Sequence, residues 1–141
     1  MKKKFKFKSK VGRTFKDKRG WLKKILDGNF SSCIEVYSKE GSVRANHYHK
    51  QDKHFIYIIY GEILYFYRDR VRGAKTRIRL MKKNDLFFTP AMQEHMAYFT
   101  QNTHFLAFSS RKRSQFNYEK DLVRINMRDY KEVELEIKRH K

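Results

Sequence analysis

The chain has 141 residues, of which 40% are apolar and 16% aromatic, and its formal net charge is +19. This length allows one sizeable core and is too short for two ordinary domains, while six Gly and one Pro exclude a collagen-like or low-complexity chain. No stretch approaches the roughly 18 apolar residues of a transmembrane helix, so we expect no membrane span.

The positive charge is concentrated at the N-terminus. Residues 1–24 contain twelve Lys or Arg and one acidic residue. We therefore predict that residues 1–18 form a basic, solvated arm, because charge runs of this kind are usually solvated. The alternative is a contact between this arm and nucleic acid, an anionic membrane or an acidic partner. The arm has no apolar core of the kind that a secretory signal needs.

Residues 19–128 are predicted to form one all-β domain. Short runs rich in Val, Ile, Tyr and Phe are separated by turn-forming residues, which is typical of a sandwich or a barrel. The predicted strands cover residues 22–26, 32–38, 43–49, 54–60, 62–68, 76–81, 85–90, 95–100 and 104–110.

The pattern loosens after residue 111. Residues 114–127 predict a short turn of helix followed by a strand, and residues 129–141 are predicted to be a C-terminal extension, in which EVELEIKRHK forms an edge strand or a frayed end. The single cysteine, Cys33, cannot form an internal disulfide, which fits a reducing, cytoplasmic location.

Four histidines mark a candidate metal site. His47 and His49 lie two residues apart on a predicted strand and share one face, since side chains alternate along a strand. If residues 50–53 reverse the chain, His54 reaches the same point, and His95 opens another strand. Convergent neutral imidazoles suit a divalent transition metal such as Zn, Fe, Mn or Ni.

The same stretch resembles the first motif of the cupin superfamily. Gly41, His47, His49, His54 and Gly61 keep every spacing of that motif, and its second motif is echoed by Asn84, Asp85, Pro90 and His95. The resemblance implies a single cupin jelly-roll β-barrel, with the four histidines as metal ligands. Cupins host many reactions, so the motif implies a fold more than a function.

One departure from the motif concerns charge. His54 stands where cupins usually have Glu, so a bound divalent ion would keep its full charge and act as a stronger Lewis acid. Four histidines can close a structural tetrahedral site or leave open positions in a catalytic octahedral one. Both possibilities stay open at this stage.

Within the superfamily, RANHYHK is most similar to small cupins of bacterial surface-polysaccharide pathways, among them 3,5-epimerases and 3,4-ketoisomerases of nucleotide-linked keto-sugars. DKRGWLKKI, at residues 17–25, resembles the opening segment of those enzymes. The resemblance implies a nucleotide-sugar substrate, proton abstraction next to a ketone and a homodimer.

That chemistry needs a base, an acid and cations for the diphosphate. His47 or His49 is a candidate base if it is free of metal. We expect both histidines to be metal ligands instead. The base would then be Glu94 or Tyr57, and the acid Tyr57 or Tyr98. Arg44 or Arg19 would bind the diphosphate.

Two other function classes remain open. One is a metal-dependent dioxygenase or hydrolase with Fe or Zn, which an all-histidine site supports. The other is a non-enzymatic cupin that binds a small ligand.

Overall fold

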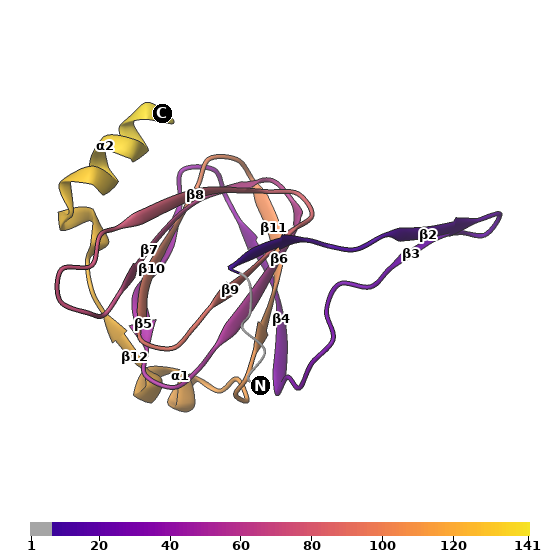
Figure 1. Cartoon of the computed structure of the whole chain (residues 1–141), viewed down its shortest axis with the longest axis horizontal. Helices are drawn as coiled ribbons and strands as arrows, with labels where there is room; N and C mark the ends of the chain where they lie inside the picture. The colour runs from indigo at the N-terminus through magenta and orange to yellow at the C-terminus, as the bar shows by residue number, and fades with distance from the viewer. Residues whose placement is uncertain (1–6) are drawn as a thin grey trace.

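A computed structural model describes residues 7–141 as two antiparallel five-stranded sheets that face each other across one core (Figure 1). The first sheet has the order β1 (Lys8–Lys10), β9 (Asp85–Thr89), β6 (His54–Tyr60), β11 (Thr103–Ser109), β4 (Ser32–Ser38). The second has the order β12 (Leu122–Arg124), β5 (Val43–His49), β10 (Gln93–Phe99), β7 (Glu62–Asp69), β8 (Arg77–Lys82). The predicted all-β jelly-roll is confirmed.

The predicted strands agree closely with the observed ones across the barrel. The runs predicted at residues 32–38, 43–49 and 54–60 match β4, β5 and β6 residue for residue. The bounds of the other predicted strands differ from the observed ones by one or two residues, with the exception of the first predicted strand. The strand predicted at residues 22–26 is wrong in its bounds, because the observed strand β3 spans Gly20–Lys23.

The core has two parts, one inside the barrel and one outside it. Alternation along β7 separates them: Ile63, Tyr65 and Tyr67 face the interior between the sheets, whereas Leu64 and Phe66 face outward. The outward pair does not meet solvent, because Phe66 is fully buried beneath the C-terminal segment. This sheet is therefore covered on both faces, and β7 is apolar or aromatic at every position from Ile63 to Tyr67.

The C-terminal cover is a helix and not a strand. The segment predicted as an edge strand or frayed end forms α2 (Lys131–Arg139), which lies against the second sheet (Figure 1) and follows the 3₁₀ turn η1 (Met127–Asp129). The alternation in VELEI suits a strand, but Val133 and Ile137 are also four residues apart and share one helix face. Those two are fully buried, while Leu135 between them is 49% exposed.

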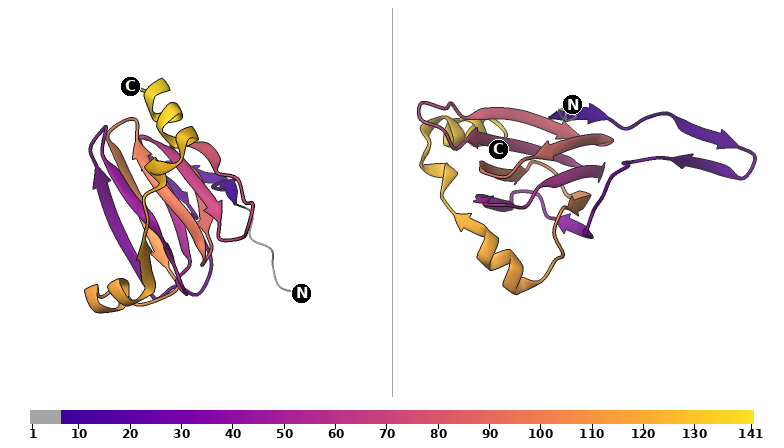
Figure 2. Two further views of the ribbon diagram at one scale, coloured as in Figure 1. Left: turned by 90° about the vertical axis from the view of Figure 1, so that its left-hand side faces the viewer. Right: turned by 60° about the horizontal axis from the view of Figure 1, so that its bottom comes forward.

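The N-terminal segment differs from a solvated arm. Backbone pairing joins Lys8–Lys10 to β9, so this part of the predicted arm belongs to the first sheet. The next strands, β2 (Thr14–Asp17) and β3 (Gly20–Lys23), pair as a hairpin that projects away from the barrel (Figures 1 and 2). Residues 1–6 of the predicted arm lie outside the described residues. Within residues 7–141, no helix is long and apolar enough to cross a bilayer.

The packing of α2 makes a direct test possible. We expect Ile137→Ala to lower the free energy of unfolding by about 2–5 kcal/mol, because it removes a fully buried side chain and leaves a cavity. Leu135→Ala, on the exposed side of the same helix, is the matched control and is expected to change it by about 0.5 kcal/mol or less. Urea unfolding followed by circular dichroism measures both, and equal effects would contradict the observed orientation of α2.

Candidate functional site

A β-bulge in β5 sets the direction of the first two histidines. The pairing of β5 with β10 runs His95 with His47 and then Met96 with Ala45, so Asn46 is the extra residue. Ala45 and Asn46 both have positive φ angles, 64° and 63°. Asn46 tolerates that conformation well, and its side-chain oxygen accepts a hydrogen bond of 2.8 Å from the backbone N–H of Met127. The bulge thus interrupts the regular alternation just before His47, as bulges next to active sites do.

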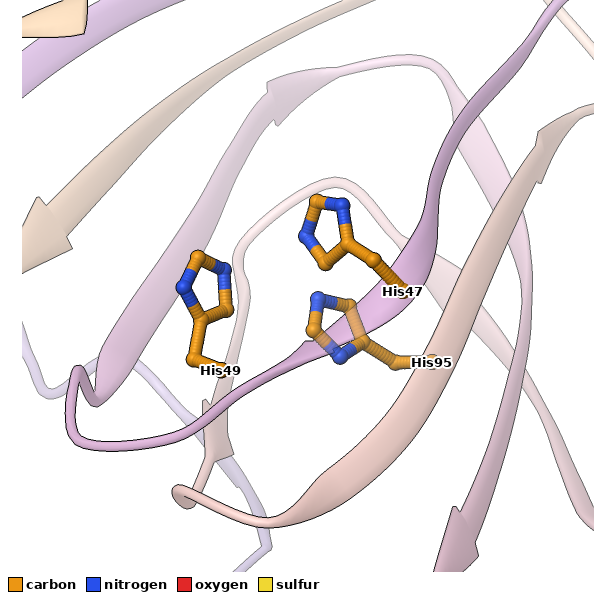
Figure 3. Close-up of side chains that lie close together, drawn as sticks. All are labelled: His47, His49 and His95. Carbon is orange, nitrogen blue, oxygen red and sulfur yellow. The ribbon is translucent and has the colours of Figure 1, made fainter. Parts of the chain in front are cut away.

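Three histidine rings meet at one end of the barrel (Figure 3). His47 and His49 project from β5 and His95 from the neighbouring β10, all toward the barrel interior. The ring centre of His47 lies 4.7 Å from that of His49 and 4.8 Å from that of His95. One nitrogen from each of the three lies within 4.8 Å of the other two. The convergence predicted for these residues is thus present in the structure.

His54 joins this cluster from the other sheet. It begins β6, and its ring centre lies 4.5 Å from that of His49. Its Nδ1 is 2.9 Å from the hydroxyl of Ser109, whereas its Nε2 is buried and has no hydrogen-bond partner among the described residues. All four predicted histidines therefore line one cavity of about 310 Å³.

His49 has a buried carboxylate partner. Its Nδ1 lies 3.0 Å from Oδ2 of Asp121, the last residue of helix α1 (Gln115–Asp121). The Asp121 carboxylate also accepts the backbone N–H groups of Gln51 and Asp52, at 2.8 Å and 3.1 Å. A carboxylate accepts only, so the His49 proton is assigned to Nδ1, which leaves the lone pair on Nε2. Asp121 thereby fixes both the tautomer and the orientation of the ring.

Burial keeps the other imidazoles neutral. Burial, with smaller contributions from His95 and His49, lowers the pKa of His47 to about 2. Burial likewise lowers the pKa of His95 to about 4, and the pKa of His54 lies well below its ordinary value, again mainly through burial. Neutral imidazoles at pH 7 have lone pairs that can accept a proton or bind a metal.

The segment after the barrel supplies two more side chains to the cavity wall. The Tyr118 ring, on α1, lies 6.0 Å from the ring centres of both His47 and His49. The guanidinium carbon of Arg113 lies 4.2 Å from the centre of the Tyr118 ring, in cation–π contact with it. A phenol and a cation thus stand beside the histidines.

The structure does not bring Tyr57, Tyr98 and Glu94 to this cavity. Tyr57 has the opposite orientation to His54 and Ile56 on β6, and its hydroxyl donates to Asn84, outside the barrel. Tyr98 belongs to the cluster under α2. The Glu94 carboxylate accepts from Tyr130 and Arg70, also on the outer face.

The two predicted diphosphate-binding arginines lie in different places. Arg44 lines the cavity, but its Nε and Nη2 already donate to the Ser38 hydroxyl and the Tyr37 carbonyl. Arg19 lies on the projecting hairpin, where it pairs with Asp17 at 2.6 Å. Among residues 7–141 of one copy of the chain, Arg44 and Arg113 are the cationic residues in the cavity wall.

The donor set fits a divalent metal ion. The Nδ1 atoms of His49 and His95 are engaged by Asp121 and by the Gln93 carbonyl, each at 3.0 Å, which leaves the lone pair of each ring on Nε2. Such outer hydrogen bonds are typical of metal-ligating histidines. His47, His49 and His95 would hold the ion, which would supply a Lewis acid. The predicted metal and its identity stay predictions.

Sequence patterns did not indicate Asp121, Tyr118 or Arg113. They follow the barrel by sequence, and only the return of the chain as α1 and β12 brings them to β5. The sequence feature that could have drawn attention to this segment is Asp121, a charged residue directly before the apolar start of LVRI.

The lowered histidine pKa values predict a loss of stability in acid. In the unfolded chain, these histidines bind protons below a pH of about 6.5. In the folded chain, His47, His54 and His95 bind protons only at a much lower pH. The free energy of unfolding therefore falls as the pH drops from about 6.5 to 4. Each such histidine contributes up to about 1.4 kcal/mol per pH unit.

Urea unfolding in chelating buffer at pH 7.5 and pH 5 measures this slope. His47→Asn should reduce the slope by about one proton, and an unchanged slope would contradict a neutral, buried His47.

No family model matches the chain, and no curated protein matches it. Solved structures match the chain in fold. dTDP-4-dehydrorhamnose 3,5-epimerase from Sulfolobus tokodaii superimposes with a TM-score of 0.69, at 17% identity over 84% of this chain and 76% of that one. RmlC from Streptococcus suis, in complex with dTDP-D-xylose, gives 0.69 at 14% identity over 88% and 73%. The sugar 3,4-ketoisomerase QdtA from Thermoanaerobacterium thermosaccharolyticum gives 0.67 at 14% identity over 88% and 91%. The chain therefore shares the barrel fold of sugar-nucleotide epimerases and ketoisomerases, as the motif resemblance implied.

Proposed function

We propose that the protein is an isomerase or epimerase of a nucleotide-linked 4-keto-sugar, as its structural neighbours are by name. The observation that carries the proposal is the buried His49–Asp121 pair in the wall of a cavity of about 310 Å³. A cavity of this size accommodates a sugar, and an imidazole oriented by a carboxylate can act as a general base.

The base would act on a carbon next to the ketone. His49 Nε2 takes the proton from that carbon, the C–H electrons form a C=C bond, and the carbonyl oxygen becomes an enediolate oxyanion. Reprotonation on the opposite face gives an epimer, and reprotonation of the former carbonyl carbon, with loss of the neighbouring hydroxyl proton, moves the ketone. The Asp121 carboxylate stabilises the imidazolium formed in the first step.

Tyr118 is the candidate for the acid. Its ring lies beside both His47 and His49 and lines the cavity, in contrast to Tyr57 and Tyr98. Arg113, which stacks on Tyr118, stands where a cation can face either the oxyanion or the diphosphate. Both side chains come from the segment that also supplies Asp121.

A metal-dependent oxygenase or hydrolase is the second candidate function. The close approach of the nitrogens of His47, His49 and His95 favours it. Because one imidazole cannot bind a metal and accept a proton through the same lone pair, the two candidates exclude each other at His49. Activity that persists after chelation favours the isomerase, and activity that is lost favours the metal enzyme.

We expect His49→Asn to lower kcat on TDP-4-keto-6-deoxyglucose by about 10²- to 10⁴-fold. Asp121→Asn should lower kcat by at least about tenfold with little change in KM, since it misorients the base. Deuterium uptake from D₂O into the sugar, followed by NMR, measures the proton-abstraction step directly.

His104→Asn is the matched control, because His104 pairs with Glu35 on the outer face of the first sheet. Equal activity of the His49 and His104 variants would refute the assignment of the base.

A homodimer is part of the proposal. The β2–β3 hairpin projects from the barrel with Phe15, Trp21 and Leu22 at 56%, 67% and 63% exposure (Figure 2). Exposed apolar side chains on a projecting element are typical of a protein interface. A second copy is the simplest partner that covers them, and it also protects sheet edges from uncontrolled pairing.

We expect light scattering after size exclusion to give twice the 17.3 kDa chain mass. The double variant Phe15→Ser with Trp21→Ser should shift the mass toward the monomer. Val71→Ser, which changes an equally exposed apolar residue in a loop of the barrel, should leave it unchanged. A monomer in the unmodified protein would contradict this part of the proposal.

A further inference from the structure

A second group of possible metal ligands lies beside the proposed base. His49, Asp52 and His54 each offer one ligand atom within 4.8 Å of the other two, and all three residues are buried. This group shares only His49 with the triad of His47, His49 and His95, and it adds a carboxylate. Asp52 lies in the turn between β5 and β6 and was not among the residues predicted from the sequence.

The side chains of this second group are held in place. Oδ1 of Asp52 accepts from the Ser110 hydroxyl at 2.8 Å and from the N–H of Lys53 at 2.9 Å. Its other oxygen, Oδ2, lies 3.5 Å from Nε2 of His54. Ser109 holds Nδ1 of His54 from the opposite side. Ordered outer contacts of this kind position ligands around a metal.

One atom of the group lacks a partner. His54 Nε2 is buried, and it has no hydrogen bond among the described residues although Asp52 is near. A buried polar atom without a hydrogen-bond partner is destabilising, so its presence points to a ligand. Two ligand atoms about 2.1 Å from a tetrahedral zinc ion lie about 3.4 Å apart, close to the observed 3.5 Å between Asp52 and His54.

Charge separates the two triads. The triad with His47 contains no anion among its three ligand residues. Asp52 supplies the second triad with a carboxylate that offsets part of a divalent charge in a buried site.

We propose that His49, Asp52 and His54 bind a divalent transition metal of the Zn²⁺ class, and that this metal inhibits the enzyme. The two-histidine, one-carboxylate donor set suits such ions. A metal bound there occupies His49 and withdraws the base from proton abstraction. Metal binding stands on the geometry alone, whereas inhibition rests on the proposed function.

Calorimetry with Zn²⁺ on the chelator-stripped full chain tests the binding. We expect Asp52→Asn to weaken Zn²⁺ binding by at least about tenfold, since the amide keeps the shape but loses the charge. His95→Gln and His47→Asn, which alter only the other triad, should change it by no more than about threefold. Circular dichroism checks that each variant is folded, and His54→Gln is a second probe of the proposed triad.

The opposite pattern would overturn the proposal: loss of Zn²⁺ binding in the His95 and His47 variants with retention in the Asp52 and His54 variants. Absence of Zn²⁺ binding by the unmodified protein would overturn it as well.

Inhibition is tested by Zn²⁺ titration of the isomerase assay. The inhibition midpoint should follow the calorimetric Kd and shift by the same factor in Asp52→Asn. Activation by Zn²⁺ would refute inhibition, and calorimetry would then decide separately whether the proposed triad binds the metal. Inactivity both with and without Zn²⁺ would refute the proposed function and the inhibition with it, and calorimetry would still decide whether the triad binds metal.

Discussion

The hydrogen bond between His49 and Asp121 is the contact on which the site depends. It joins the barrel to the segment that follows it, because Asp121 belongs to α1 and its carboxylate also accepts two backbone N–H groups of the turn after β5. The carboxylate is 6% exposed and would be costly to bury without these partners. Its partners therefore fix the end of α1, and with it Tyr118 and Arg113, against the histidines.

The C-terminal segment stabilises this arrangement from further along the chain. β12 pairs with β5 over the two histidines, with Leu122 opposite His49 and Arg124 opposite His47. Met127 then donates to Asn46 at the bulge. The strand that carries the histidines is thus held between β10 on one side and the returning chain on the other, so the aim of the rings depends on residues far away in sequence.

The strands of the barrel could be predicted from the sequence because strand patterns are local. β4, β5 and β6 are short runs containing β-branched or aromatic residues between clear turns. The spacing of His47, His49 and His54 places their rings through strand alternation and one tight turn. The helix α2 was missed because VELEI satisfies two periods at once, and only packing against the second sheet selects the helical one.

The side chains that accompany the proposed base could not be predicted from local sequence either. Tyr57 is three residues from His54 and therefore points to the opposite face of β6, so closeness in sequence was misleading there. Asp121 is 72 residues from His49, and no local pattern links them.

Replacing the usual motif carboxylate by His54 has one consequence for all of this chemistry. Four imidazole rings share the cavity wall, and burial together with repulsion between protonated rings lowers the pKa values of His47, His54 and His95. His49 is distinguished by the Asp121 carboxylate, which accepts its Nδ1–H at 3.0 Å and so leaves the lone pair on Nε2. This asymmetry supports His49 as the proposed base among four similar side chains. Because the Asp121 carboxylate comes from α1, the feature that distinguishes His49 is supplied by the chain beyond the barrel and not by the histidine motif itself.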